Sequence, residues 1–185
     1  AGARAAPGEP RVLLNNGVSM PVMAFGANIW SADTCRRATL DALAAGFRNI
    51  WSSELVGANC QRAQAEALGA SGVPRSEVFL AGTVDTQGCT GEERCYRETL
   101  GQSGGQLRAL AGGGALDMLM LDYPPRAPGC RPILGQWRAL EELYASGRAR
   151  AIAVSNFSPE QLRCIVGNAS ATVPAVNQVL FAVGH

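Results

Sequence analysis

The chain has 185 residues and no lysine, so that all 16 of its basic side chains are arginines. Without a lysine it can neither form a Schiff base with a carbonyl compound nor hold a phosphate through an ammonium group. Its only histidine is His185, the last residue. No interior imidazole is therefore present to act as a general base or a metal ligand. These two absences exclude several common kinds of catalysis by this chain alone.

Features of membrane and nucleic-acid proteins are also missing. No apolar run approaches the roughly 18 residues that a membrane-spanning helix needs. The formal net charge is only +1, and no basic stripe stands out, which argues against a nucleic-acid partner. We expect a protein with no transmembrane segment of its own.

The six cysteines show no Cys-x-x-Cys spacing, which argues against a zinc site or a thioredoxin-like centre. Cys35, Cys60, Cys95 and Cys164 fall on expected helices and are interpreted as small packing residues. The alternative for the remaining two is a disulfide between Cys89 and Cys130, because both lie in loops that follow neighbouring strands.

The length and the 47% hydrophobic content suit one domain with a single core. We expect an N-terminal extension over 1–10 and a domain over 11–185. The extension consists mostly of small residues and Pro, with one Arg, and resembles the remainder of a targeting segment. This favours an organelle, a plastid or a mitochondrion, over the cytoplasm.

Strand and helix patterns alternate along the domain. Residues 11–22 predict a hairpin, because Asn-Gly at 16–17 is a strong tight-turn signal. Six strands are expected, at 22–26, 47–52, 78–82, 116–121, 149–154 and 174–180. Five helices are expected, at 34–45, 60–68, 92–110 (broken at Ser-Gly-Gly, 103–105), 132–146 and from Ser158 onward.

This alternation predicts parallel βαβ units in the order of a TIM-type barrel. Such barrels typically need about 250 residues, so we predict a partial barrel of about six parallel strands and five helices. An open arc leaves two sheet edges exposed. Protein subunits of a larger complex are therefore expected to cover those edges.

Three segments carry a family resemblance. They are Leu-Asn-Asn-Gly-Val-Ser-Met-Pro-Val at 14–22, Gly-Arg-Ala-Arg-Ala-Ile-Ala-Val-Ser-Asn-Phe-Ser at 147–158 and Pro-Ala-Val-Asn-Gln-Val at 174–179. The chain resembles the aldo-keto reductases, which implies a reductase barrel that uses NADP. In that family an Asp, a Tyr, a Lys and a His carry hydride and proton transfer.

The same four positions here hold Trp51, Val56, Thr83 and Asp122. The resemblance therefore implies a degenerate catalytic site. Ser155, Asn156 and Gln178 match the residues that hold the nicotinamide carboxamide in the family. We interpret them as vestigial, kept because they satisfy buried backbone groups, and expect no cofactor; residual NADP binding is the alternative.

A carboxylate site is a rival interpretation. Glu54, Asp85 and Asp122 fall just past the ends of three successive strands, where barrel enzymes place catalytic groups. They could bind a divalent cation or form an acid–base pair. The simpler interpretation is solvated loop residues or ion pairs with Arg126 or Arg131, because no spacing motif supports a metal.

Taken together, the sequence predicts a protein that is not an enzyme, a structural or accessory subunit of a larger assembly, for example a respiratory or photosynthetic complex. Two alternatives stay open. One is a divergent NADP-dependent oxidoreductase completed by another chain, and the other is a nucleotide-binding regulatory protein.

Overall fold

The chain opens with the expected hairpin. The computed structural model describes residues 9–168 and 172–180. Strands β1 (Arg11–Leu13) and β2 (Ser19–Pro21) pair antiparallel. Gly17 in the turn has φ +80°, a left-handed conformation that costs glycine little. The Asn-Gly signal thus identified the turn correctly.

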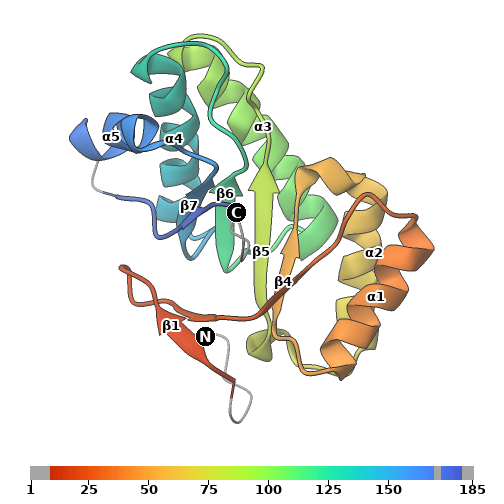
Figure 1. Ribbon diagram of the computed structural model, residues 1–185. Coiled ribbons are helices and arrows are strands. Elements are labelled where there is room, and N and C mark those ends of the chain that lie inside the picture. The colour runs from red at the N-terminus through yellow and green to blue at the C-terminus, as the bar shows by residue number, and fades with distance from the viewer. Residues whose placement is uncertain (1–8, 169–171, 181–185) are drawn as a thin grey trace.

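A six-stranded parallel sheet follows, with its strands side by side in chain order. The strands are β3 (Ala24–Gly26), β4 (Asn49–Ser52), β5 (Phe79–Val84), β6 (Met118–Leu121), β7 (Ile152–Ser155) and β8 (Asn177–Gln178). The sheet curls into part of a barrel (Figure 1). The prediction of a partial barrel with six parallel strands is confirmed.

Five α-helices cover the outer face of this sheet (Figure 1). They are α1 (Ala32–Ala44), α2 (Gly57–Ala70), α3 (Glu92–Ala111), α4 (Cys130–Ala145) and α5 (Pro159–Gly167). Two short 3-10 helices, η1 (Glu54–Val56) and η2 (Arg75–Glu77), precede α2 and β5. Helix α5 starts with the expected Ser158 cap, and Gln161 completes a capping box, which satisfies two orphan backbone donors.

The two faces of the sheet have separate cores. Because side chains alternate along a strand, residues such as Leu80, Leu119 and Ile152 face the helices, where they pack around Trp137 and Leu140. The opposite positions face the barrel interior, and they form a second buried cluster with the hairpin: Leu14, Val18, Phe79, Ala81, Met118, Met120, Ala151 and Ala153.

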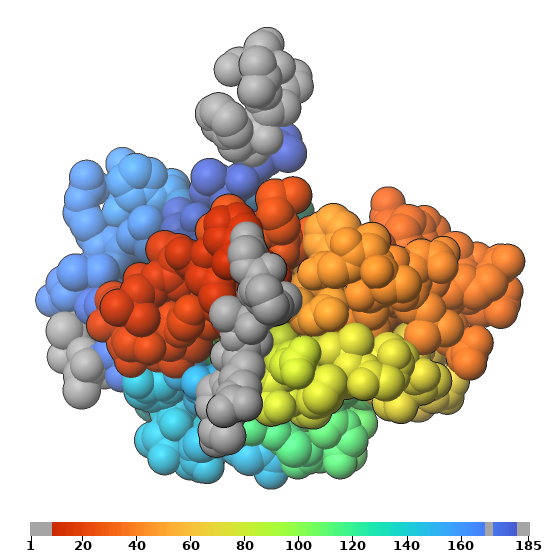
Figure 2. Space-filling view, turned by 90° about the horizontal axis from the view of Figure 1, so that it is seen from below, coloured from red at the N-terminus to blue at the C-terminus, as the bar shows by residue number. Residues whose placement is uncertain are grey.

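The hairpin closes the amino ends of the strands. Asn16 donates to the carbonyl of Arg150 at 2.9 Å, and Asn15 to that of Pro174 at 3.3 Å. Seen from below, the hairpin lies across the underside of the molecule (Figure 2). The inner apolar cluster is thereby covered at this end, whereas the carboxyl ends of the strands lie at the opposite end (Figure 1).

Two expected elements differ from the sequence prediction. Helix α3 runs unbroken from Glu92 to Ala111, although a break at 103–105 was expected. Glycine in a helix costs only about 1 kcal/mol, and the buried face of α3, with Ser103 fully buried, outweighs that cost. The last strand is only Asn177–Gln178, shorter than the expected 174–180, because only these two residues pair with β7.

The cysteine prediction was wrong. All six cysteines are paired, as Cys35–Cys60, Cys89–Cys95 and Cys130–Cys164. Cys89 pairs within its own loop and helix rather than with Cys130. Sequence spacing could not show this, because all four cysteines that were expected on helices meet partners that only helix packing or a loop brings close.

Some expectations lie outside the described residues. They concern 1–8 of the N-terminal extension and the single histidine, His185. Among the residues that the structure describes, no helix is long and apolar enough to cross a membrane.

Candidate functional site

Polar side chains replace apolar ones where the inner face of the sheet reaches the carboxyl ends of the strands. Each of four neighbouring strands contributes one residue that is no more than 5% exposed: Ser53 after β4, Thr83 in β5, Asp122 after β6 and Ser155 at the end of β7. In α/β barrels this end carries the active site. The arrangement marks the candidate site.

Asp122 is the centre of this group. Its Oδ2 accepts hydrogen bonds from Ser53 Oγ at 2.8 Å and from Thr83 Oγ1 at 3.0 Å. Both bonds end on Oδ2, so Oδ1 is the oxygen left for a proton or a substrate. Two hydroxyl donors fix the carboxyl group without adding a positive charge.

Burial raises the pKa of Asp122 above its ordinary value. The two hydroxyl bonds oppose this by stabilising the carboxylate, and the charge of Asp85 adds to the rise. Desolvation dominates because no cation within residues 9–168 and 172–180 pairs with the group. A carboxyl group with a raised pKa can hold a proton closer to neutral pH, which suits acid–base chemistry.

Asn156 ties the ends of β6, β7 and β8 together. Its side-chain amide donates to the carbonyl of Asp122 and to Ser155 Oγ, both at 3.0 Å, and its backbone N–H donates to the carbonyl of Gln178 at 2.8 Å. It is the one non-glycine residue with a positive φ, 62°, within the described ranges. Asparagine tolerates this conformation better than most residues. The bond to Asp122 fits the expectation that Asn156 satisfies a buried backbone group.

Buried glutamines hold the β4 end of the site. Gln106 of α3 donates to the carbonyl of Ser52 at 2.8 Å, and Gln61 of α2 donates to that of Ser53 at 3.1 Å. Gln106 crosses β5 at Gly82, where a Cβ would lie 2.6 Å from its Nε2. Glycine at 82 therefore makes room for the Gln106 amide, which holds the carbonyl of Ser52 next to Ser53.

The three expected carboxylates do gather at this end. Glu54 Oε2 accepts from the backbone N–H of Asp85 at 2.9 Å. Burial raises the pKa of Glu54, with further rises from the charges of Asp85 and Asp122. Asp85 is bonded to Gln87, and Arg126 Nε donates to Gln87 Oε1 at 2.8 Å. Arg126 thus contacts the loop through Gln87 and not through a carboxylate.

No group of three potential metal ligands lies together in the part of the chain that the structure describes. Carboxylate oxygens alone could still hold a hard cation only if several converged on one point. Here Glu54 and Asp85 are used by loop bonds, and Asp122 faces two hydroxyls.

The other two predicted positions lie apart from Asp122. Trp51 faces the barrel interior, where its Cε3 would lie 2.8 Å from a Cβ at position 26, so Gly26 allows the ring to pack. Val56 packs with Ala27 and Cys60 against α1 and α2. The structure therefore brings Thr83 and Asp122 together and places Val56 in a separate apolar cluster.

A cavity of about 600 Å³ lies on the inner face beside Trp51, between β3, β4 and β8. Its lining is mostly apolar, with Met20, Val22 and Met118 among its walls. Two buried polar atoms at this cavity, Asn49 Oδ1 and Trp51 Nε1, have no partner among the described residues.

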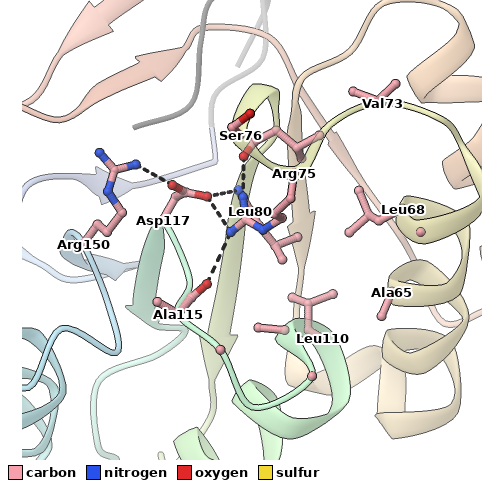
Figure 3. A pocket seen from close by; sticks show the side chains of 15 residues that line it. Ala65, Leu68, Val73, Arg75, Ser76, Leu80, Leu110, Ala115, Asp117 and Arg150 are labelled. Atoms are coloured by element: carbon pink, nitrogen blue, oxygen red, sulfur yellow. Dashed lines mark hydrogen bonds and ion pairs between the residues drawn. The ribbon is translucent and has the colours of Figure 1, made fainter. Parts of the chain in front are cut away.

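A second cavity, of about 780 Å³, lies at the opposite end between α2 and α3 (Figure 3). Arg75 and Arg150 flank the buried Asp117 there, with contacts of 2.8 and 2.6 Å. Arg75 also donates to the carbonyls of Val78 and Ala115. These polar groups satisfy one another, and conserved chemistry in barrels lies at the other end, so we assign this cluster to folding.

Comparison with known proteins identifies the scaffold. Residues 22–183 match the model of the aldo/keto reductase family. The chain belongs to this family. Morphine 6-dehydrogenase of Pseudomonas putida is 34% identical over 92% of this chain and 54% of its own length, and an aldo-keto reductase of Mycobacterium sp. (strain JLS) is 33% identical over 93% and 58%. The chain thus spans about half the length of the curated relatives it matches.

Solved structures agree with this assignment. An aldo/keto reductase from Brucella melitensis has a TM-score of 0.80 at 27% identity, over 94% of this chain and 63% of that one. The Bombyx mori aldo-keto reductase in complex with NADP has a TM-score of 0.75 at 25% identity, over 94% and 59%.

These relatives contradict the expectation that the chain is not an enzyme. They are named as a dehydrogenase and as reductases, and the family is enzymatic. The substitutions at Trp51 and Val56 led the sequence argument to a degenerate site. That argument counted lost residues and gave no weight to what a buried Asp122 can do.

Sequence reasoning missed Ser53 as a member of the site. Its signal was present, because Ser53 is two residues beyond Trp51 and so has the same inward direction along an extended segment. Only the curl of the sheet shows that this direction converges on Asp122.

Proposed function

We propose that this chain forms the substrate and nicotinamide side of an NADP-dependent oxidoreductase that interconverts a carbonyl compound and an alcohol, with Asp122 as the residue that moves the proton. The observation that carries the proposal is the burial of Asp122 at the carboxyl ends of the strands, held by Ser53 and Thr83 with a raised pKa. The family assignment supports the reaction class.

Asp122 would act through Oδ1. Two hydroxyl groups hold Oδ2 and so restrict the orientation of the carboxyl group. The position of its other oxygen, Oδ1, is restricted with it. When protonated, Oδ1 can donate to the oxygen of a carbonyl substrate, and when ionised it can accept a proton from an alcohol. General acid–base groups contribute about 10²- to 10⁴-fold to rates.

The residues near Asp122 offer hydrogen-bonding groups that suit a neutral amide group on a bound molecule. Ser155 Oγ accepts from Asn156, which leaves its own O–H as a donor, and Gln178 places an exposed side-chain amide at the end of β8. Such groups suit the carboxamide of a nicotinamide ring, which needs both donors and acceptors. The cofactor supplies the hydride when it is bound; Ser155 and Gln178 would orient it.

Further protein is needed to close the barrel. The sheet ends at β3 and β8, whose unpaired edges can accept another strand. Exposed apolar side chains stand beside these edges, with Met23 58% and Leu180 90% exposed. The cavity next to Trp51 is lined by residues of both edge strands, β3 and β8. We propose that additional strands, from this polypeptide or from another chain, fill this space.

The proton-transfer role is tested by NADPH-dependent reduction of a panel of aldehydes and ketones, with the wild type and Asp122→Asn. The variant keeps the acceptor for Ser53 and Thr83 but cannot release a proton, so its kcat should fall at least ten-fold while NADPH still quenches Trp fluorescence. Asp33→Asn, on the exposed face of α1, is the matched control and should retain wild-type kcat.

Two results would overturn the proposal. Equal kcat for Asp122→Asn and the wild type would remove Asp122 from the reaction. Absence of NADPH binding by the chain, both alone and in any complex purified with it, would show that NADP is not its cofactor.

The proposal of additional strands is tested separately by native mass spectrometry of the protein purified from its source. A mass equal to this chain alone, together with full activity, would show that no further strands are required.

A further inference from the structure

The cysteines of this chain form a complete set of crosslinks. Six cysteines give three disulfides, and none is free. The Cα–Cα distances are 5.5, 5.0 and 5.2 Å, all within the usual range for disulfides. Six cysteines allow 15 pairings, and the fold places each with one neighbour only.

The crosslinks occupy defined places in the helical layer. Cys35–Cys60 joins α1 to α2 at one end of the sheet, and Cys130–Cys164 joins α4 to α5 at the other (Figure 1). Cys89–Cys95 ties the loop after β5 to the first turn of α3. This is the loop that carries Asp85 and Thr86 beside the candidate site.

Most of these cysteines are shielded from solvent. Cys35, Cys60, Cys89 and Cys95 are no more than 1% exposed and Cys164 is 8% exposed, whereas Cys130 is only partly buried. Exchange with an external thiol requires access to a sulfur atom. The fully buried bonds, Cys35–Cys60 and Cys89–Cys95, suit a permanent structural role rather than one in catalysis or signalling.

We propose that this protein acquires its fold in an oxidising compartment and depends on these three disulfides for its stability. Disulfides persist in secreted proteins and in oxidising compartments, whereas the thiols of cytosolic proteins stay reduced. Full pairing of six cysteines in one small domain is expected in an oxidising compartment and is not expected in the cytosol.

The crosslinks form by thiol–disulfide exchange. Each pair of thiols loses two electrons and two protons as its S–S bond forms, and the disulfide of the oxidising partner, a protein disulfide or oxidised glutathione, takes them up and is reduced to two thiols. Three such exchanges complete the set.

The three crosslinks should differ in effect. Closing a longer loop removes more conformational entropy from the unfolded chain. The sequence separations are 34 for Cys130–Cys164, 25 for Cys35–Cys60 and 6 for Cys89–Cys95. Loss of stability should therefore be largest for the first and smallest for the last.

The full chain should be produced in the bacterial periplasm and in the cytoplasm, and its free thiols titrated in denaturant with 5,5′-dithiobis(2-nitrobenzoic acid). The periplasmic protein should show no free thiol and a mass lower by six hydrogens than the reduced protein. Reduction should lower its Tm by about 10 °C or more.

Paired variants separate the crosslinks from the packing of the cysteines. Cys130→Ala with Cys164→Ala should lower Tm most, then Cys35→Ala with Cys60→Ala, then Cys89→Ala with Cys95→Ala, and each should respond less to reductant than the wild type. If a pair is not crosslinked, its variant will respond to reductant as the wild type does.

Two outcomes would overturn the proposal. One is six free thiols in the periplasmic protein. The other is a reduced cytoplasmic protein with the same Tm as the oxidised one. Neither readout involves NADPH or turnover, so the result does not depend on the proposed reaction.

Discussion

Two buried aspartates stand at opposite ends of the same strand. Asp117 precedes β6 and is 3% exposed, and Asp122 follows it and is 5% exposed. Asp117 is paired with Arg75 and Arg150 and accepts from the backbone N–H of Leu80. Asp122 meets only hydroxyl groups, and burial raises its pKa. At equal burial, one carboxylate is therefore neutralised by two arginines and the other is held by hydroxyl groups alone, and it is the second to which we assign the proposed proton transfer.

Substitution of Asp117 by Asn should have the largest effect on stability. Asn cannot neutralise two guanidinium groups, and removal of one partner from a buried ion pair costs about 3–5 kcal/mol. Arg75 and Arg150 are partly exposed, at 48% and 35%, and water will reduce this cost to about 2–3 kcal/mol. Urea unfolding measures it.

The matched control for that experiment is Asp33→Asn, which removes an exposed ion pair with Arg37 and should change stability by less than about 0.5 kcal/mol. If both variants lose the same small free energy of unfolding, the ion pairs of Asp117 do not stabilise the amino end of β6. The contrast between Asp117 and Asp122 would then disappear.

Gly82→Ala tests the support of the carboxyl end. The new Cβ would meet Gln106 Nε2 at 2.6 Å and Leu116 Cδ1 at 3.1 Å, so the amide must leave the carbonyl of Ser52. Overpacking of this kind costs about 1–3 kcal/mol. Gly69→Ala on α2 has nothing within 4 Å and should stabilise the helix slightly. Equal stability of the two variants would contradict the role of Gln106.

Thr83→Val keeps the shape of a fully buried side chain and removes one of the two donors to Asp122. Loss of a hydrogen bond to a charged group should cost about 1–2 kcal/mol at neutral pH and raise the pKa of Asp122 further. Carboxyl chemical shifts by NMR follow that pKa. Thr90→Val, in an exposed loop, should leave both quantities unchanged; a shift in the control would point to an indirect effect.

Asp122→Asn should have the smallest effect on stability, and of opposite sign. The raised pKa means that the folded state binds more protons than the unfolded state, whose pKa lies near about 4. The contribution of Asp122 is therefore complete below about pH 4 and declines as pH rises through the folded-state pKa. Asn does not titrate, so the variant should gain stability relative to the wild type over this interval.

Urea unfolding of both proteins between about pH 4 and pH 8 checks this sign. Glu54 also has a raised pKa, but it is present in both proteins and largely cancels in the difference. A difference that is flat with pH would show that the fold does not raise the pKa of Asp122 and would contradict this prediction.

Much of the fold could be predicted from local patterns. The Asn-Asn-Gly turn, the Ser158 cap and the strand–helix alternation each depend on neighbours in sequence, and each was predicted correctly. The unbroken α3 was not, because its glycines favour a break while its buried face favours continuation. The family resemblance located Thr83 and Asp122, although it implied a degenerate site.

What the sequence by itself determined is the set of chemical groups and the order of the elements: no lysine, no interior histidine, six cysteines and a barrel's succession of strands and helices. Tertiary structure alone decided which cysteines pair, which aspartate meets arginines and which meets hydroxyls. The physical reason is distance along the chain: apart from Cys89–Cys95, these contacts join residues far apart in sequence, and only the packing of helices on a curled sheet brings them together.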